Sequence, residues 1–421
     1  MPSLLLHITS LLVGILLLLT ANGLLSSLLT LRLHAADVPM EDIGLLMSCY
    51  FVGMLLGARF ADRIVRKVGH IRAFAAFAGV MTIAAQVHGM TLWLPLWGIL
   101  RFIAGYAMAG LFLVIESWLN HRASPSNRGQ LFSVYMITCH AGMSAGNQLL
   151  RIEEPQAMLL FQLAAILYAA ALLPIALTKV EMPTLGTAEP LPLRTLWRRS
   201  PVGVGGAFAA GLLGGAFFAM GPLYASASGM NADGVARWMT VVIVGGALLQ
   251  WPLGRLSDKV GRQIIYRLVC MALCVSCALL ALLPDAPPTW KLLLAGVYGG
   301  VLFMVYPLSV AQANDWIRPE QMVPAAGALL LAYGVGAGVS PLLLGHLLTW
   351  GGVAAYGAYG AVIAAGLGVY AWFREHVRPP LPVEDQTPFV HMLRTSTALA
   401  SLDPRRDDAQ LDLPFDERDA L

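Results

Sequence analysis

The chain has 421 residues, of which 57% are hydrophobic and only 12% are charged, with a formal net charge of +3 and a mean hydropathy of +0.69. Because a water-soluble domain carries about a quarter of charged residues, this composition excludes a protein that covers its whole surface with polar side chains and places the chain in a lipid bilayer. All five cysteines lie in apolar runs, which argues against a disulfide framework.

Taken in chain order, the apolar runs define the expected elements. Twelve runs have about the length that a helix needs to cross a bilayer, roughly 17–25 residues. They cover approximately residues 4–30, 43–61, 72–90, 92–118, 129–151, 157–177, 202–226, 235–254, 264–284, 290–313, 323–348 and 352–373. The first run lacks a basic start and is too long for a cleaved signal peptide, so we expect it to be the first spanning helix.

The spans fall into two groups of six. We therefore predict an all-α membrane protein with twelve transmembrane helices in two pseudo-symmetric six-helix bundles, residues 1–177 and 201–374. Residues 178–200 contain prolines and arginines and are typical of a polar connector between bundles. Residues 375–421 form a charged, proline-bearing tail without a long apolar face, which we expect to be largely disordered.

The orientation in the membrane follows from the lysines and arginines. Most of the 27 fall in the connector, the tail and the loops on the same side. The loops on the opposite side carry four, namely Arg32, Arg151, Arg237 and Lys291. Because Lys and Arg accumulate in cytoplasmic loops, we expect both termini to be cytoplasmic and the protein to lie in a bacterial inner membrane.

The two halves carry similar residues at a nearly constant offset. Asp62 and Asp258 differ by 196 positions, and Trp118 and Trp316 differ by 198. Such matches in the same order indicate a six-helix unit present twice, related by an axis along the membrane normal.

A charged loop marks the second helix of each half. Residues 254–262 read G-R-L-S-D-K-V-G-R where an apolar run ends, and residues 58–67 repeat the pattern with both glycines replaced, by Ala58 and Val65. This pattern resembles the loop motif of the major facilitator superfamily, transporters of twelve helices in two similar halves. The resemblance implies an alternating-access transporter whose charged loops form a cytoplasmic gate. The candidate gate residues are Asp62, Arg63, Arg66, Glu116, Asp258, Lys259 and Arg262.

Within this gate, the resemblance implies that Asp62 and Arg63 latch the two halves together when the cytoplasmic side is closed. Asp62 would face the N-terminus of the helix that begins near Pro324, where a carboxylate is favoured by the helix dipole. The alternative is that these charges only anchor the topology of the loops.

Arg101 lies about nine residues into the fourth span. An arginine at this depth costs on the order of 3 kcal/mol on insertion scales. The run Arg101 to Gly105, R-F-I-A-G, resembles the helix-four motif of the family, whose arginine faces the central cavity and takes part in proton or substrate coupling. Asn22 lies at a similar depth and is its expected neighbour. The alternative is an anchor whose side chain reaches the interface.

Two further titratable groups are candidates for proton uptake, His140 in the fifth span and Glu116 at the cytoplasmic end of the fourth. The simpler alternatives are a packed neutral histidine and a solvated helix end. No Asp or Glu lies at mid-membrane depth, which argues against a transporter of cationic drugs and favours an anionic or neutral polar solute. Proton coupling remains a hypothesis at this point.

Polar side chains in other spans complete the candidate substrate and coupling set. Its members are Arg101, Asn22, His140, Gln250, Tyr306 and Gln312. Each alone is more simply explained as a hydrogen bond between helices. We expect no enzyme activity, cofactor, metal or nucleic-acid partner, and a monomer that binds a small molecule and protons. The open alternatives are an efflux transporter for drugs or metabolites and a transporter-like receptor or scaffold that recruits a partner through its tail.

Overall fold

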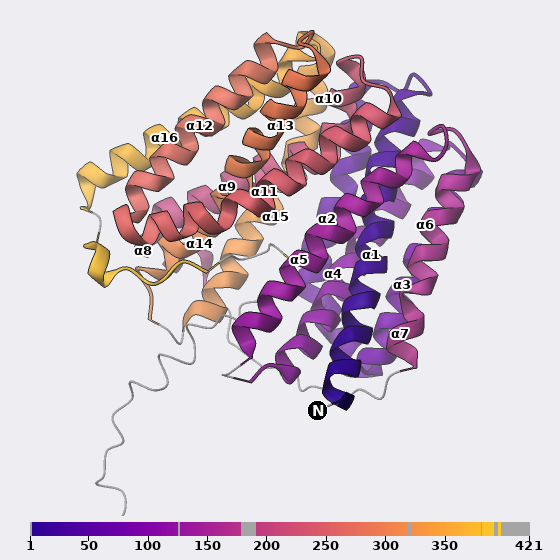
Figure 1. The fold of residues 1–421 in the computed structure, drawn as a ribbon, viewed down its shortest axis with the longest axis horizontal. Helices are drawn as coiled ribbons and strands as arrows, with labels where there is room; N and C mark the ends of the chain where they lie inside the picture. Colours follow the sequence, from indigo (N-terminus) through magenta and orange to yellow (C-terminus); the bar gives the residue numbers. More distant parts are fainter. Residues whose placement is uncertain are drawn as a thin grey trace, which may run out of the picture.

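The computed structural model describes residues 2–124, 127–177, 191–318, 321–379, 381–390 and 395–396. Two groups of long helices lie inclined to one another and meet near α10 (Figure 1). The helices of the first half are α1 (Pro2–His34), α2 (Met40–Val68), α3 (His70–Met90), α4 (Leu94–Arg122), α5 (Arg128–Gln148), α6 (Met158–Ala170) and α7 (Leu172–Ala176), with a 3-10 turn, η1 (Leu149–Arg151), after α5.

The second half repeats this order. Its first span is built from α9 (Pro201–Gly215), a π-helical turn η2 (Ala216–Met220) and α10 (Gly221–Ala227). The others are α11 (Ala232–Val260), α12 (Arg262–Leu282), α13 (Pro288–Leu302) continued by α14 (Val305–Asn314), α15 (Met322–Gly351) and α16 (Ala354–Val377). Two short elements lie outside the spans, α8 (Leu193–Arg199) before α9 and η4 (Val383–Asp385) after α16.

This architecture confirms the predicted all-α membrane fold with twelve helices in two halves. Eleven helices in the described part of the chain are long and apolar enough to cross a membrane on composition alone. The remaining one, α5, is 21 residues long. It carries His140, Asn147 and Gln148, which lower its hydropathy, and it packs between α1 and α11.

The loops after α2 and α11 each contain a glycine with a positive φ angle. Gly69 has φ 86° and Gly261 has φ 105°, and glycine adopts these angles at no steric cost because it lacks a Cβ. The helices on either side match in length, 29 residues before and 21 residues after. The counterpart of Gly261 is therefore Gly69, so the expected replacement of this glycine by Val65 is wrong. Gly69 and Gly261 are 192 positions apart, whereas Asp62 and Asp258 are 196 positions apart. The two alignments of the loops therefore differ by about one helical turn.

We call the side on which α1 begins and α16 ends the terminal side, and the opposite side the far side. On the far side, α5 and α11 join the two halves. The Gln148 side chain donates to Thr240 Oγ1 at 2.6 Å and to the carbonyl of Ala236 at 3.1 Å. Beyond them, Arg151 Nε lies 2.5 Å from Asp233 Oδ1. These contacts hold the far-side ends of the two bundles together.

The pair α2 and α15 closes the far side in a different way, by approach of backbone to backbone. A Cβ built on Gly44 would collide with the carbonyl oxygen of Pro341, and one built on Gly345 would lie 2.7 Å from that of Met40. Small residues allow such contact between helices in a membrane. Nearer the terminal side the contact is made by a side chain, because a Cβ on Gly334 would meet the side chain of Leu55.

The tail differs from expectation in its described part. After α16 ends, residues 381–390 turn back beneath α8 and α14 on the terminal side (Figure 1). The Arg378 guanidinium lies 3.4 Å from the centre of the Trp316 ring, and the Phe389 ring covers Gly254. Residues 381–390 and 395–396 are thus not disordered, because backbone and hydroxyl groups in them find partners on the bundles. The remainder of the expected disordered tail lies outside the described residues.

Candidate functional site

Arg101 occupies the interior of the first bundle. Its side chain is 3% exposed, and its guanidinium lies 4.2 Å from the centre of the Tyr50 ring. The Tyr50 hydroxyl donates to Asn22 Oδ1 at 3.3 Å, and the Tyr168 hydroxyl donates to the same oxygen at 3.4 Å. Side chains from α1, α2, α4 and α6 therefore converge, and Tyr50 contacts both Arg101 and Asn22.

The electrostatics of this cluster are unusual. Among the described residues, no carboxylate forms an ion pair with Arg101, and its Nε is buried without a hydrogen-bond partner. The ring of Tyr50 offers only a cation–π contact, which is worth about 2 kcal/mol when desolvated. A guanidinium presents its donors in a planar fork that matches a carboxylate or phosphate. The cluster is therefore a cationic site in which the Nε–H donor of Arg101 is still unpaired among the described residues.

Tyr50 and Tyr168 are members of this cluster that the sequence analysis does not single out. Both are buried in the first bundle. Tyrosine is amphipathic, so each ring fits an apolar run without interrupting it, and only the polar partner at the tip of the ring distinguishes it from a packing residue. That partner becomes visible only once the helices are assembled, so no motif or spacing in the sequence marks either tyrosine.

His140 and Gln250 lie where α5 meets the second bundle. The His140 ring stands edge-on to the Phe303 ring, with centroids 6.3 Å apart, and Gln250 Nε2 donates to the Phe303 carbonyl at 3.0 Å. His140 Nδ1 donates to the carbonyl of Met136 at 2.8 Å, because a carbonyl oxygen only accepts. The structure therefore gathers these two predicted residues around Phe303, at the seam between the bundles.

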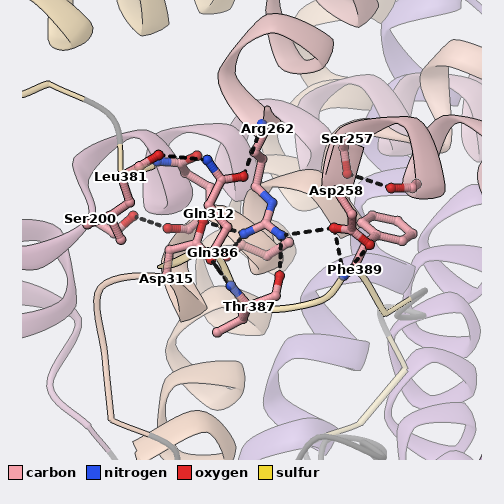
Figure 2. Close-up of polar contacts among 12 residues, drawn as sticks. Ser200, Ser257, Asp258, Arg262, Gln312, Asp315, Leu381, Gln386, Thr387 and Phe389 are labelled. Atoms are coloured by element: carbon pink, nitrogen blue, oxygen red, sulfur yellow. Dashed lines mark hydrogen bonds and ion pairs between the residues drawn. The ribbon is translucent and has the colours of Figure 1, made fainter. Parts of the chain in front are cut away.

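Tyr306 and Gln312 make other contacts within the second bundle. The Tyr306 ring packs edge-on against Tyr333, with centroids 5.4 Å apart. Gln312 is buried, and its backbone carbonyl accepts from the Ser200 hydroxyl at 3.2 Å, next to the charged network on the terminal side (Figure 2). The contacts of the described residues thus link Asn22 with Arg101 through Tyr50 and His140 with Gln250 through Phe303, while Tyr306 packs on Tyr333 and Gln312 accepts from Ser200.

Arg262 is the centre of the terminal-side network (Figure 2). Its side chain is fully buried and forms an ion pair with Asp315, which is 3% exposed. Its second amino group contacts Asp258 at 3.4 Å and also donates to the carbonyl of Thr387. The first amino group donates to the carbonyl of Ala311 at 3.2 Å. Both amino groups of Arg262 are therefore paired, as burial of a charge requires because desolvating it alone is costly, whereas its Nε has no hydrogen-bond partner among the described residues.

The tail supplies several partners of this network. The backbone N–H of Phe389 donates to both carboxylate oxygens of Asp258, each at 3.0 Å. Thr387 donates to Asp315 Oδ1 through its N–H at 3.0 Å and its hydroxyl at 2.8 Å. The two aspartates are therefore held by donors that come from the C-terminal segment.

Gln386 adds a contact to the start of α12. Its side-chain oxygen accepts from the backbone N–H of Arg262 at 3.1 Å, and its side-chain amide donates to the carbonyl of Leu381 at 2.9 Å. Asp258 and Arg262, expected at a gate between bundles, are thus bound here by the chain's own C-terminal segment.

Glu116 lies in a comparable environment in the first bundle. It is fully buried, and its Oε1 accepts from the Tyr135 hydroxyl at 2.7 Å. The hydroxyls of Thr395 and Ser396 donate to Oε1 and Oε2. The alternative interpretation from the sequence, that Glu116 lies at a solvated helix end, is therefore wrong, because the tail and α5 cover this carboxylate.

Of the other gate candidates on α2, Arg63 and Arg66 are exposed and Asp62 is half-buried. Asp62 and Arg66 form an ion pair within the helix at 3.6 Å, with side chains 41% and 43% exposed, and the Arg63 guanidinium lies 4.8 Å from the centre of the Phe60 ring. Among the described residues, no hydrogen bond or ion pair joins Asp62 to α15. The expected latch between Asp62 and the start of α15 is therefore not formed in this conformation.

Twelve spans in two matched halves, with a buried cation in one bundle and charged loops between the second and third helices of each, define a membrane transport protein. The sequence model of the Major Facilitator Superfamily matches residues 11–303 and 229–404. The chain belongs to this superfamily.

Relatives and solved structures agree with this assignment. An uncharacterized MFS-type transporter, YcaD, of Salmonella heidelberg is 30% identical over 342 residues, covering 80% of this chain and 88% of the relative. One of Yersinia pestis is 29% identical over 343 residues, with the same coverage. The crystal structure of the nucleoside transporter NupG matches with a TM-score of 0.74 at 14% identity, covering 89% of this chain and 100% of that one. A bacterial homolog of the lysosomal transporter Spinster, inward-facing and occupied, matches with a TM-score of 0.71 at 13% identity, covering 92% and 99%.

Proposed function

We propose that the protein is a secondary active transporter that moves a small anionic or strongly polar solute by alternating access. The observation that carries this proposal is Arg101, a buried cation without a carboxylate partner among the described residues. By the distribution of Lys and Arg, the terminal side is cytoplasmic, and the bacterial relatives support a bacterial inner membrane.

The charge of Arg101 selects the class of solute. An arginine in the membrane interior costs on the order of 3 kcal/mol on insertion scales, and a cationic solute beside it would add repulsion in a medium of low dielectric. An anion would instead form charge-assisted hydrogen bonds with the guanidinium. Tyr50, Tyr168 and Asn22 place further polar atoms beside it, so a solute with both an acidic group and hydroxyl or amide groups fits best.

The conformation fits the half of the transport cycle in which the far side is closed. Direct contacts of α5 with α11 and of α2 with α15 hold the far side together. Rocking of one bundle against the other would break these contacts and open that side. His140 lies at the seam where the bundles would separate, and Glu116 lies on the terminal side, so these two groups remain the candidates for coupling to protons.

The first test is a thermal-stability screen of the purified protein with small carboxylates, phosphates, sugars, nucleosides and organic cations. A ligand present at 100 times its Kd stabilises the protein by about 2.7 kcal/mol. We expect anions to raise the melting temperature of the wild type and of Arg72→Gln, an exposed arginine that serves as the matched control, but not of Arg101→Gln. Selective stabilisation by organic cations would contradict the assignment of substrate class.

The second test measures uptake of the stabilising solute into proteoliposomes, with and without a pH gradient. We expect uptake that the gradient accelerates in the wild type and in Arg72→Gln, and loss of at least tenfold, about 1.4 kcal/mol, in Arg101→Gln. Normal coupled uptake by Arg101→Gln would remove Arg101 from the site. A solute that binds without flux in any variant would favour the receptor alternative.

A further inference from the structure

The C-terminal segment contacts both bundles. We define the strap as residues 386–389 together with Thr395 and Ser396. At one end, the backbone of Phe389 donates to Asp258 of α11, and Thr387 donates to Asp315, which follows α14 (Figure 2). These partners all belong to the second bundle.

The other end of the strap lies on the first bundle. Thr395 and Ser396 each donate a hydroxyl to Glu116 of α4, a fully buried carboxylate that also accepts from Tyr135 of α5. Hydrogen bonds to an ionised acceptor are about twice as strong as neutral ones. Both ends of the strap are therefore held by buried or half-buried carboxylates, and the two ends lie on different bundles.

We propose that the strap is a conformational brace, which stabilises the state with the far side closed and must leave at least one bundle before the terminal side closes. This inference rests on the alternating-access function proposed above. Asp258 and Glu116 belong to different bundles, so the strap contacts that reach both carboxylates in this conformation are fitted to the present separation of the two bundles. A contact shifts the equilibrium between two conformations only by the difference in its strength between them. Because rocking of the bundles changes the distance between Asp258 and Glu116, the strap contacts differ in strength between the two states.

Two features indicate that the strap contacts are specific. Phe389 covers Gly254, where a Cβ would collide with the ring, so this position on α11 has room for the strap only because it is glycine. The strap also uses its backbone N–H and C=O groups on Asp258, Asp315 and Arg262 in one short run. Tail residues that merely lie on a surface would not satisfy three charged side chains in this way.

The experiment measures the separation of the terminal-side ends directly. Spin labels on Val68→Cys and Val260→Cys, two exposed positions at the ends of α2 and α11, report the distance between the bundles by pulsed electron resonance in nanodiscs. We expect the wild type to populate mainly the state with the ends apart. The double variant Thr395→Val, Ser396→Ala removes both donors to Glu116, and Glu384→Gln, an exposed tail residue, is the matched control.

We expect the double variant to lower the ratio of open to closed terminal-side states by roughly tenfold, since two charge-assisted bonds are lost from one state only. A chain ending at Pro379 should show a shift at least as large, and Glu384→Gln should match the wild type. Identical distance distributions in all four proteins would overturn the brace. The distances do not depend on knowing the solute, so a failure to find transport would affect the proposed function and leave this result intact.

Discussion

The buried pair of Arg262 and Asp315 offers the sharpest test of the terminal-side network. The two side chains are 0% and 3% exposed. Removing one partner of such a pair leaves an uncompensated buried charge and costs about 3–5 kcal/mol. In Arg262→Met, Asp315 keeps both donors from Thr387, so we expect the lower end of this range, about 3 kcal/mol.

The reverse change, Asp315→Leu, leaves the guanidinium with Asp258 at 3.4 Å and with two carbonyl oxygens. We expect a similar loss, about 3 kcal/mol. The double variant removes both charges together and should cost clearly less than the sum, with a coupling energy of at least about 2 kcal/mol. The exposed Lys259→Met is the control and should stay within about 0.5 kcal/mol of the wild type.

The assay is reversible unfolding by sodium dodecyl sulfate in mixed micelles, followed by tryptophan fluorescence. Free energies of unfolding are compared for the wild type, both single variants, the double variant and the control. Losses from the two single variants that simply add up in the double variant would refute the reasoning. So would an Arg262→Met protein as stable as Lys259→Met, because the charge on Asp315 would then not be buried in the way the structure shows.

Three further predictions use the same assay. Gly105→Ala places a Cβ against the Tyr50 carbonyl oxygen, whereas Gly79→Ala meets nothing within 4 Å; the first should cost about 1–3 kcal/mol and the second less than about 0.5 kcal/mol. Tyr135→Phe removes a donor from Glu116 and should cost about 1.5–3 kcal/mol. Arg151→Ala breaks a half-exposed ion pair and should cost about 0.2–1 kcal/mol, less at high salt.

The spans are the most predictable part of the fold, because hydrocarbon thickness sets a length that apolar runs reveal directly. Even α5, the most polar span, begins within one residue of its expected start at 129. The helix ends are less predictable. α2 continues to Val68, well past the expected end at 61, because its polar last turns remain helical on the terminal side.

The correct alignment of the two charged loops cannot be found from Asp62 and Asp258. Asp62 and Asp258 suggest one alignment, but the backbone aligns Gly69 with Gly261, two glycines with positive φ. The better signal is present in the sequence, since K-V-G precedes the break in both halves, at residues 67–69 and 259–261. A glycine needed for its backbone angles is a stronger marker of equivalence than an aspartate, which can shift by one turn and remain at a helix end.

The strap cannot be predicted from the sequence, for a physical reason. Its polar contacts use backbone N–H and C=O groups, three hydroxyls and the Gln386 side chain. None of these groups leaves a hydrophobic pattern in the sequence. Low hydrophobicity indicates that a segment cannot form its own core. It does not exclude docking of that segment on buried carboxylates supplied by the rest of the chain.

The alignment through Gly69 also explains why the two loops differ in their contacts with the strap. The residue after Gly261 is Arg262, which is buried among Asp258, Asp315 and Thr387. The residue after Gly69 is His70, which is buried against Trp118 with ring centroids 6.0 Å apart. An aromatic contact thus stands where the second half has a charged network, so the duplicated loops have lost their chemical equivalence. In the proposed transport cycle the two loops would therefore move under different constraints, one set by packing and one by hydrogen bonds that the tail supplies.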